Sequence, residues 1–199
     1  GRIAYTDERV RNVFKYWLEL VKPDYFLPNH SSYSWQEAQP FLYNGTAAMY
    51  LIGNYIAPNF PKELDGKMGF FQFPIIDPNV PVAEDAPTDT IHIPTKANNK
   101  KDARKFLKFM ARAENQTLVN AALLQIPTNK HASAVDNYFL NKGVEVLSNA
   151  SGTAQFYDRD THPNMAKEGM KGFQEFMVKP ERLDKILERL EKVRQRTFK

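Results

Sequence analysis

The sequence contains no cysteine among its 199 residues. This absence excludes disulfide bonds, catalysis by a thiol and zinc sites built from cysteine. Long apolar runs are also missing, because no segment approaches the roughly 18 apolar residues that a membrane-spanning helix needs. The first residues do not follow the charged-then-apolar pattern of a secretory signal peptide. Since 42% of the residues are hydrophobic, we expect a soluble globular protein with a sizeable core.

The signature motifs of most enzyme classes are missing as well. There is no glycine-rich phosphate or dinucleotide loop, no HExxH zinc motif and no GxSxG nucleophile elbow. The four histidines are scattered along the chain rather than spaced as metal ligands, at His30, His92, His131 and His162. The sequence therefore predicts neither a metal site nor a cofactor.

Positive charge is in slight excess, with 27 Lys and Arg against 23 Asp and Glu and a net charge of +4. Such an excess raises the question of nucleic-acid binding. The densest basic stretch, residues 96–108, alternates charged with apolar residues at helical spacing, which favours a solvated helix face over a phosphate-binding face. A basic nucleic-acid-binding module therefore remains an alternative, but we do not expect nucleic acid as a partner.

Hydrophobic periodicity predicts about seven helices and only three or four strands. In the second of these helices, Ser34 and Glu37 have the spacing of a capping box. Helices are expected over residues 6–21, 34–44, 98–110, 114–124, 134–147, 164–177 and 181–196. Strands are expected over residues 47–52, 68–74 and 89–94, and the intervening helices indicate an α/β protein.

Residues 156–164, FYDRDTHPN, carry an unusual density of functional groups. In one interpretation they form an exposed loop whose charges pair locally and whose Asp160 or Thr161 caps the next helix. In the other they contact a ligand, because sugars need charged hydrogen-bonding partners and an aromatic ring. A third interpretation is a glycoside-acting enzyme that uses Asp158, Asp160 and His162.

Residues 41–56, FLYNGTAAMYLIGNYI, carry the most specific pattern in the chain. The stretch resembles the extracellular solute-binding proteins of bacterial ABC sugar importers, the maltodextrin-binding-like group. Neighbouring segments agree in order: SWQEA before it, then MGFFQFP, the segment from IHIPTK to ARAENQ, and QIPTNK. The matching residues within the stretch are Phe41, Gly45, Ala48, Met49, Gly53 and Tyr55.

The resemblance implies an α/β fold of the periplasmic-binding-protein type II, helix-rich and with a small mixed sheet. Family members are about twice as long, and this sequence is similar to their second half. Residues 1–82 and 130–199 are therefore expected to form most of the C-terminal lobe, while residues 83–129 belong with the N-terminal lobe. Without the remainder of that lobe, the chain is expected to expose apolar surface and to self-associate.

The same resemblance implies that the protein binds a sugar in an interlobe cleft and delivers it to the permease subunits of an ABC transporter. Binding would close the two lobes around a hinge, and no bond would be made or broken, so we do not expect an enzyme. The implied location is periplasmic or otherwise extracytoplasmic.

The resemblance also indicates which residues contact the solute. Gly53 would let the backbone turn sharply at the end of a strand, so that Asn54 and Tyr55 reach the cleft and the Tyr55 ring stacks on a sugar. Asp89 matches a ligand-binding Asp at the start of a strand, and His162 matches a ligand-binding His near the penultimate helix. The full set of predicted contacts is Asn54, Tyr55, Asp89, Tyr157, Asp158, Arg159 and His162, whereas the spacing of Phe41, Met49 and Phe106 predicts core positions.

Overall fold

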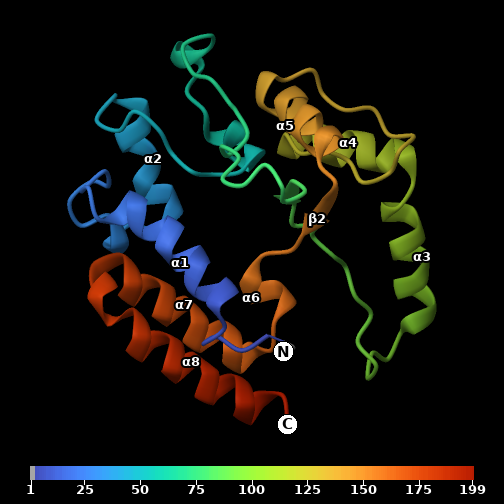
Figure 1. Ribbon diagram of the computed structural model, residues 1–199. Helices are drawn as coiled ribbons and strands as arrows, with labels where there is room; N and C mark the ends of the chain where they lie inside the picture. The colour runs from blue at the N-terminus through green and yellow to red at the C-terminus, as the bar shows by residue number, and fades with distance from the viewer. Residues whose placement is uncertain (1–2) are drawn as a thin grey trace. The chain divides into compact units, whose positions relative to one another are not determined.

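The structure, a computed structural model, describes residues 3–199 and divides into two compact units (Figure 1). The terminal unit comprises the described residues up to Tyr50 together with Phe156–Lys199, and the central unit comprises Leu51–Gln155. Among these residues, no helix is both long enough and apolar enough to cross a membrane. The predicted lobe boundaries after residues 82 and 129 concern a longer protein and stay predictions.

The regular elements of the terminal unit are all helices among its described residues. Its predicted helices are confirmed to within two residues at each end, because their apolar periodicity and end signals agree. The elements are α1 (Glu8–Val21), η1 (His30–Ser32), α2 (Trp35–Tyr43), α6 (Tyr157–Asp160), α7 (Pro163–Val178), η4 (Pro180–Arg182) and α8 (Leu183–Thr197), where η denotes a short 3-10 helix.

The predicted capping box of α2 is confirmed. The Ser34 hydroxyl accepts from the backbone N–H of Glu37 at 3.2 Å, and the Glu37 carboxylate accepts from the backbone N–H of Ser34 at 2.8 Å. The helix contains Pro40 and ends at Tyr43, Asn44 is its C-cap, and Gly45 follows with a φ of +77°. That left-handed backbone favours glycine, so a local signal in the sequence fixed this helix end.

The core of the terminal unit lies between α1, α7 and α8. Phe14 of α1 meets Phe176 of α7 edge to face, with ring centroids 5.0 Å apart. Helices α7 and α8 lie side by side (Figure 1) and approach closely at Gly172, where an added Cβ would lie 3.1 Å from Cγ2 of Ile186. The buried residues of this core are Phe14, Phe176, Ile186, Leu187 and Leu190.

A buried carboxylate on α8 fixes the N-terminal segment. Glu191 accepts a hydrogen bond from the backbone N–H of Tyr5 at 2.9 Å and another from Nε of Arg194 at 2.9 Å. The Arg194 hydrogen bonds lower the pKa of Glu191 to about 2, against the opposing effect of burial. The segment before α1 is therefore held by a charge-assisted contact.

The central unit combines three helices with one pair of very short strands. The helices predicted over 98–110 and 114–124 are confirmed, whereas the one predicted from residue 134 begins at Tyr138. The core of the central unit joins η2 to α5. Just after η2, Phe60 packs edge to face on Phe139 of α5, with ring centroids 4.7 Å apart. The elements are η2 (Asn54–Asn59), η3 (Lys62–Leu64), β1 (Ala83–Asp85), α3 (Lys100–Met110), α4 (Ala113–Leu123), α5 (Tyr138–Asn149) and β2 (Gly152–Ala154).

The three predicted strands are wrong. Residues 47–52, 68–74 and 89–94 form no strand, and the sheet of the described chain is the parallel pair β1 and β2, with Ala83 opposite Gly152. An apolar run signals a tendency to burial, but a strand also needs a neighbour to take its backbone hydrogen bonds. The predicted mixed sheet is thus a small parallel one, within a helix-rich α/β fold.

Some apolar side chains of these three segments are exposed, as are some on α3. Leu51 is 78% exposed, Met49 72% and Phe71 65%, and on α3 Phe106 is 54% exposed. The core positions predicted for Met49 and Phe106 are therefore wrong within this chain, because more than half of each side chain remains exposed to solvent. The expected exposure of apolar surface is confirmed.

Candidate ligand-binding site

Gly53 is needed for a reason other than the predicted sharp turn. Its φ of −77° and ψ of 167° are values that any residue adopts, so the entry of the chain into η2 does not require glycine for its backbone conformation. A Cβ on Gly53 would instead lie 2.5 Å from Cε1 of Tyr55. The half-buried Tyr55 ring lies directly against the Gly53 backbone, which leaves no room for a side chain there.

Asn54, the neighbour of Tyr55, is fixed by a second glycine. A Cβ on Gly143 of α5 would lie 2.6 Å from Nδ2 of Asn54. The start of η2 is thus packed on α5, and Ile56 and Ala57 behind it are buried. The Tyr55 ring is consequently carried on a short helix that packs on α5, and the Gly53 backbone lies directly against the ring.

Asp89, the third predicted contact in the central unit, is exposed. It lies in the segment after β1, and the strand predicted to start at this residue does not form. The parallel pair β1 and β2 ends at Asp85, four residues before Asp89.

Tyr157 in α6 faces the interior of the terminal unit. Its hydroxyl donates to the backbone carbonyl of Met165 at 3.1 Å and lies 2.5 Å from the hydroxyl of Tyr5. The ring lies on α7, where a Cβ on Gly169 would be 2.4 Å from the Tyr157 hydroxyl oxygen. Burial, and then the hydrogen bond with Tyr5, raise the pKa of Tyr157, so the phenol stays protonated.

The charged side chains of α6 point to solvent. Asp158, Arg159 and Asp160 are all exposed, and the guanidinium of Arg159 lies 5.5 Å from the centre of the Phe156 ring. That distance is within the range of a cation–π contact. The α6 turn thus presents two carboxylates and one guanidinium to solvent while Tyr157 anchors the turn from below.

His162 caps α7. Its Nδ1 accepts from the backbone N–H of Asn164 at 3.2 Å, and its ring lies 6.2 Å from that of Phe198. The cap was expected at Asp160 or Thr161, and it is the histidine because the chain enters the helix through Pro163. With Nδ1 accepting, the neutral ring carries its proton on Nε2 and offers a donor to solvent.

The predicted contacts therefore fall into two groups that the structure describes separately. In the terminal unit Tyr157, Asp158, Arg159 and His162 share one turn and the helix start that follows it. In the central unit Asn54 and Tyr55 are neighbours in η2, and Asp89 lies in a different segment. Across residues 3–199 there is no group of three or more His, Asp or Glu side chains placed to hold a metal ion.

Comparisons with known proteins decide the family. The sequence model of the bacterial extracellular solute-binding proteins matches residues 4–117, which is more than half of the chain. This chain belongs to the bacterial extracellular solute-binding protein family.

Two relatives of this solute-binding protein add detail. An uncharacterised extracellular-binding protein of an ABC transporter from Pyrococcus horikoshii is 31% identical over 142 residues, which cover 67% of this chain and 29% of that protein. The solved structure of the bacterial solute receptor AcbH matches with a TM-score of 0.87 at 29% identity, over 99% of this chain and 52% of the receptor. AcbH is described as having an exclusive preference for β-D-galactopyranose. The present chain therefore spans about half of the receptor's length, and its match covers less than a third of the Pyrococcus horikoshii protein.

The comparisons bear on the enzyme alternative as well. Both relatives of this solute-binding protein are described as binding proteins or receptors. In addition, Nδ1 of His162 is used to cap α7. A glycoside-acting mechanism through Asp158, Asp160 and His162 therefore has no support among these relatives.

Sequence reasoning missed one organising residue of the central unit. The side-chain oxygen of Gln116 accepts from the backbone N–H groups of Thr128 at 3.1 Å and Asn129 at 2.9 Å. Gln116 ends the ARAENQ motif and the other two lie in QIPTNK, so two of the segments that carry the family resemblance are joined here. Their separate matches were the signal, but only the fold shows that the two segments meet.

Proposed function

We propose that the protein to which this chain belongs binds a sugar and passes it to the membrane subunits of an ABC transporter. The observation that carries the proposal is the likeness to AcbH over 99% of this chain, together with that receptor's described preference for β-D-galactopyranose. Family membership supports an extracytoplasmic location and a small-molecule ligand. Galactose is the first sugar to test.

We further propose Tyr55, Asp89, Asp158, Arg159 and His162 as side chains that contact the sugar. A half-buried ring supplies an apolar face for the C–H groups of a pyranose, while carboxylates, a guanidinium and an imidazole donor match its hydroxyls. Asn54 and Tyr157, also predicted as contacts, are proposed to hold Tyr55 and α6 in place, because each is packed against a helix backbone.

The test is calorimetric titration and thermal unfolding with D-galactose, D-glucose and maltose. It uses both this chain and a longer protein that contains it. At a sugar concentration of 100 times Kd, we expect about 2.7 kcal/mol of added stability, which a thermal scan resolves. Binding without formation of any product supports a receptor. Turnover of a glycoside, or the absence of any sugar response in the longer protein, would contradict the proposal.

Two tyrosine variants connect the test to the structure. Tyr55→Ala removes the proposed stacking ring and should weaken sugar binding by roughly 2- to 12-fold, since aromatic stacking contacts are worth about 0.5–1.5 kcal/mol. Tyr25→Ala is the matched control, because Tyr25 is 74% exposed in the terminal unit. Equal effects of both variants would argue against a specific role for Tyr55.

A further inference from the structure

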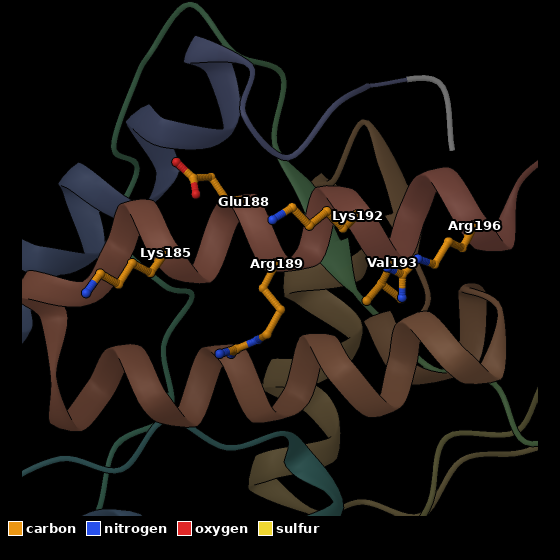
Figure 2. Close-up of a pocket in the computed structure, with 6 residues that line it drawn as sticks. All are labelled: Lys185, Glu188, Arg189, Lys192, Val193 and Arg196. Atoms are coloured by element: carbon orange, nitrogen blue, oxygen red, sulfur yellow. The ribbon is translucent and has the colours of Figure 1, made fainter.

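The outer face of α8 carries a stripe of cations that the proposed function does not use. Lys185, Arg189, Lys192 and Arg196 recur at intervals of four, three and four residues, so they fall within about 60° of the helix circumference. They line a shallow hollow of about 310 Å³ together with Glu188 and Val193 (Figure 2). We call these four residues the α8 basic stripe.

Three of the four cations are available to an external anion. Arg189 reaches toward α7 in Figure 2 and pairs with Glu175 at 2.7 Å. In the described part of the chain, the structure gives no ion pair to Lys185, Lys192 or Arg196, and all three side chains are exposed. Glu188 places a single carboxylate beside them, so the hollow keeps a net positive charge.

The shape of the stripe distinguishes between classes of partner. Protein interfaces usually have a buried apolar or aromatic core within a polar rim. Here the one apolar side chain at the hollow is the half-buried Val193, and the apolar face of α8 is occupied by the core of the terminal unit. The stripe is straight and extends about 16 Å, the length of 11 helical residues. Such a row of cations without an apolar anchor suits a diffuse array of negative charges rather than a shaped pocket.

We propose that the α8 basic stripe binds the anionic headgroups of a phospholipid surface. Clustered Lys and Arg near such a surface each contribute to the attraction, and the attraction falls with added salt. A receptor that serves a membrane transporter works close to such a surface. The contact is independent of sugar binding, so the two proposals can fail separately.

The experiment is cosedimentation with vesicles, using this chain and the longer protein that contains it. Vesicles of phosphatidylcholine alone are compared with vesicles of phosphatidylcholine and phosphatidylglycerol. The test variant combines Lys185→Gln, Lys192→Gln and Arg196→Gln and retains Arg189, which pairs with Glu175. The control combines Lys101→Gln, Arg104→Gln and Lys108→Gln at exposed positions of α3. Like the test variant, it removes two lysines and one arginine. Circular dichroism verifies that both variants are folded.

We expect binding to the anionic vesicles only, weakening with salt, and a roughly 100-fold lower partition coefficient for the α8 variant. The α3 variant should retain nearly all of the binding. Equal losses in both variants would overturn the proposal, because net charge alone would then explain the attraction. Binding to poly-glutamate but not to vesicles would also overturn the proposal and would indicate an acidic protein partner. The absence of binding to either probe would overturn it as well.

Discussion

The hydroxyl oxygens of Tyr5 and Tyr157 lie 2.5 Å apart, although 152 residues separate them in the sequence. Tyr157 donates to the carbonyl of Met165, so Tyr5 donates to Tyr157. The backbone N–H of Tyr5 is also bound, to Glu191 of α8. Tyr5 thus joins α8 to α6, the turn that carries Asp158 and Arg159.

Tyr157→Phe should lower the stability of the terminal unit by about 1–2 kcal/mol, because two hydrogen bonds are lost and the Tyr5 hydroxyl keeps no partner there. The pKa of Tyr157 is raised in the folded protein, so its contribution is complete below pH of about 10 and is lost as the pH rises further. The variant should therefore show a flatter decline of stability on the alkaline side. Urea unfolding from pH 7 to 11 measures this, with Tyr25→Phe as the exposed control. An unchanged alkaline slope would contradict it.

Glu191→Gln should reduce stability at pH 7 and change the acid side of the pH profile. The pKa of Glu191 is lowered from 4.5 to about 2, so its contribution is present above pH 4.5 and disappears as the pH falls toward 2. The variant should lose that dependence. Thermal unfolding between pH 2 and 7 reports it. Glu188→Gln, at an exposed position of the same helix, should change stability at neutral pH by less than about 0.5 kcal/mol; a similar loss in both variants would argue against a special role for Glu191.

Gly53→Ala should destabilise the central unit by about 1–3 kcal/mol, because the new methyl group would overlap the Tyr55 ring. Gly69→Ala is the control, since nothing lies within 4 Å of a Cβ there. In the double variant Gly53→Ala/Tyr55→Ala the overlap is removed. Adding Gly53→Ala to Tyr55→Ala should therefore cost much less stability than adding it to the unchanged chain. If the double variant shows only the sum of the two single effects, the close contact is not the reason for glycine at this position.

Gln116→Ala should open the loop that contains Thr128 and Asn129, whose backbone N–H groups lose their acceptor. Hydrogen exchange of these amides should accelerate by about 10-fold, corresponding to roughly 1.4 kcal/mol of lost protection. Glu114→Ala in the same helix serves as the control, as its carboxylate is exposed and 4.0 Å from Arg112. Equal protection in the variant and in the unchanged chain would show that the loop is held by other contacts.

Exposed apolar side chains should make this chain self-associate. Replacing Leu51 and Leu118, which are 78% and 69% exposed, with serine should shift the concentration-dependent association to higher protein concentration. Light scattering over a dilution series gives the measurement. Lys101→Ser controls for a change at an exposed site. A monodisperse monomer at all concentrations would contradict the expectation.

Local signals predicted the helices well. The capping box at Ser34 and Glu37 was found where its spacing placed it, Asn99 caps α3 close to the predicted start of that helix, and Gly45 follows α2. Such signals are complete within a few residues, so no distant segment is needed to interpret them. The strands failed for the opposite reason, since an extended run such as residues 68–74 becomes a strand only beside a partner.

For the candidate site, too, the sequence indicated some features and only the structure showed others. The sequence alone indicated the family, through the ordered motifs in and around residues 41–56, and it identified the polar turn around Asp158. Only the tertiary structure decided that Tyr157 turns inward onto Gly169, that His162 caps α7 and that Gly53 makes room for Tyr55. These outcomes depend on distances between segments that are far apart in the chain or on the direction of a single ring. A sequence pattern fixes the spacing of residues along the chain, but packing against a particular neighbour fixes which way each side chain faces.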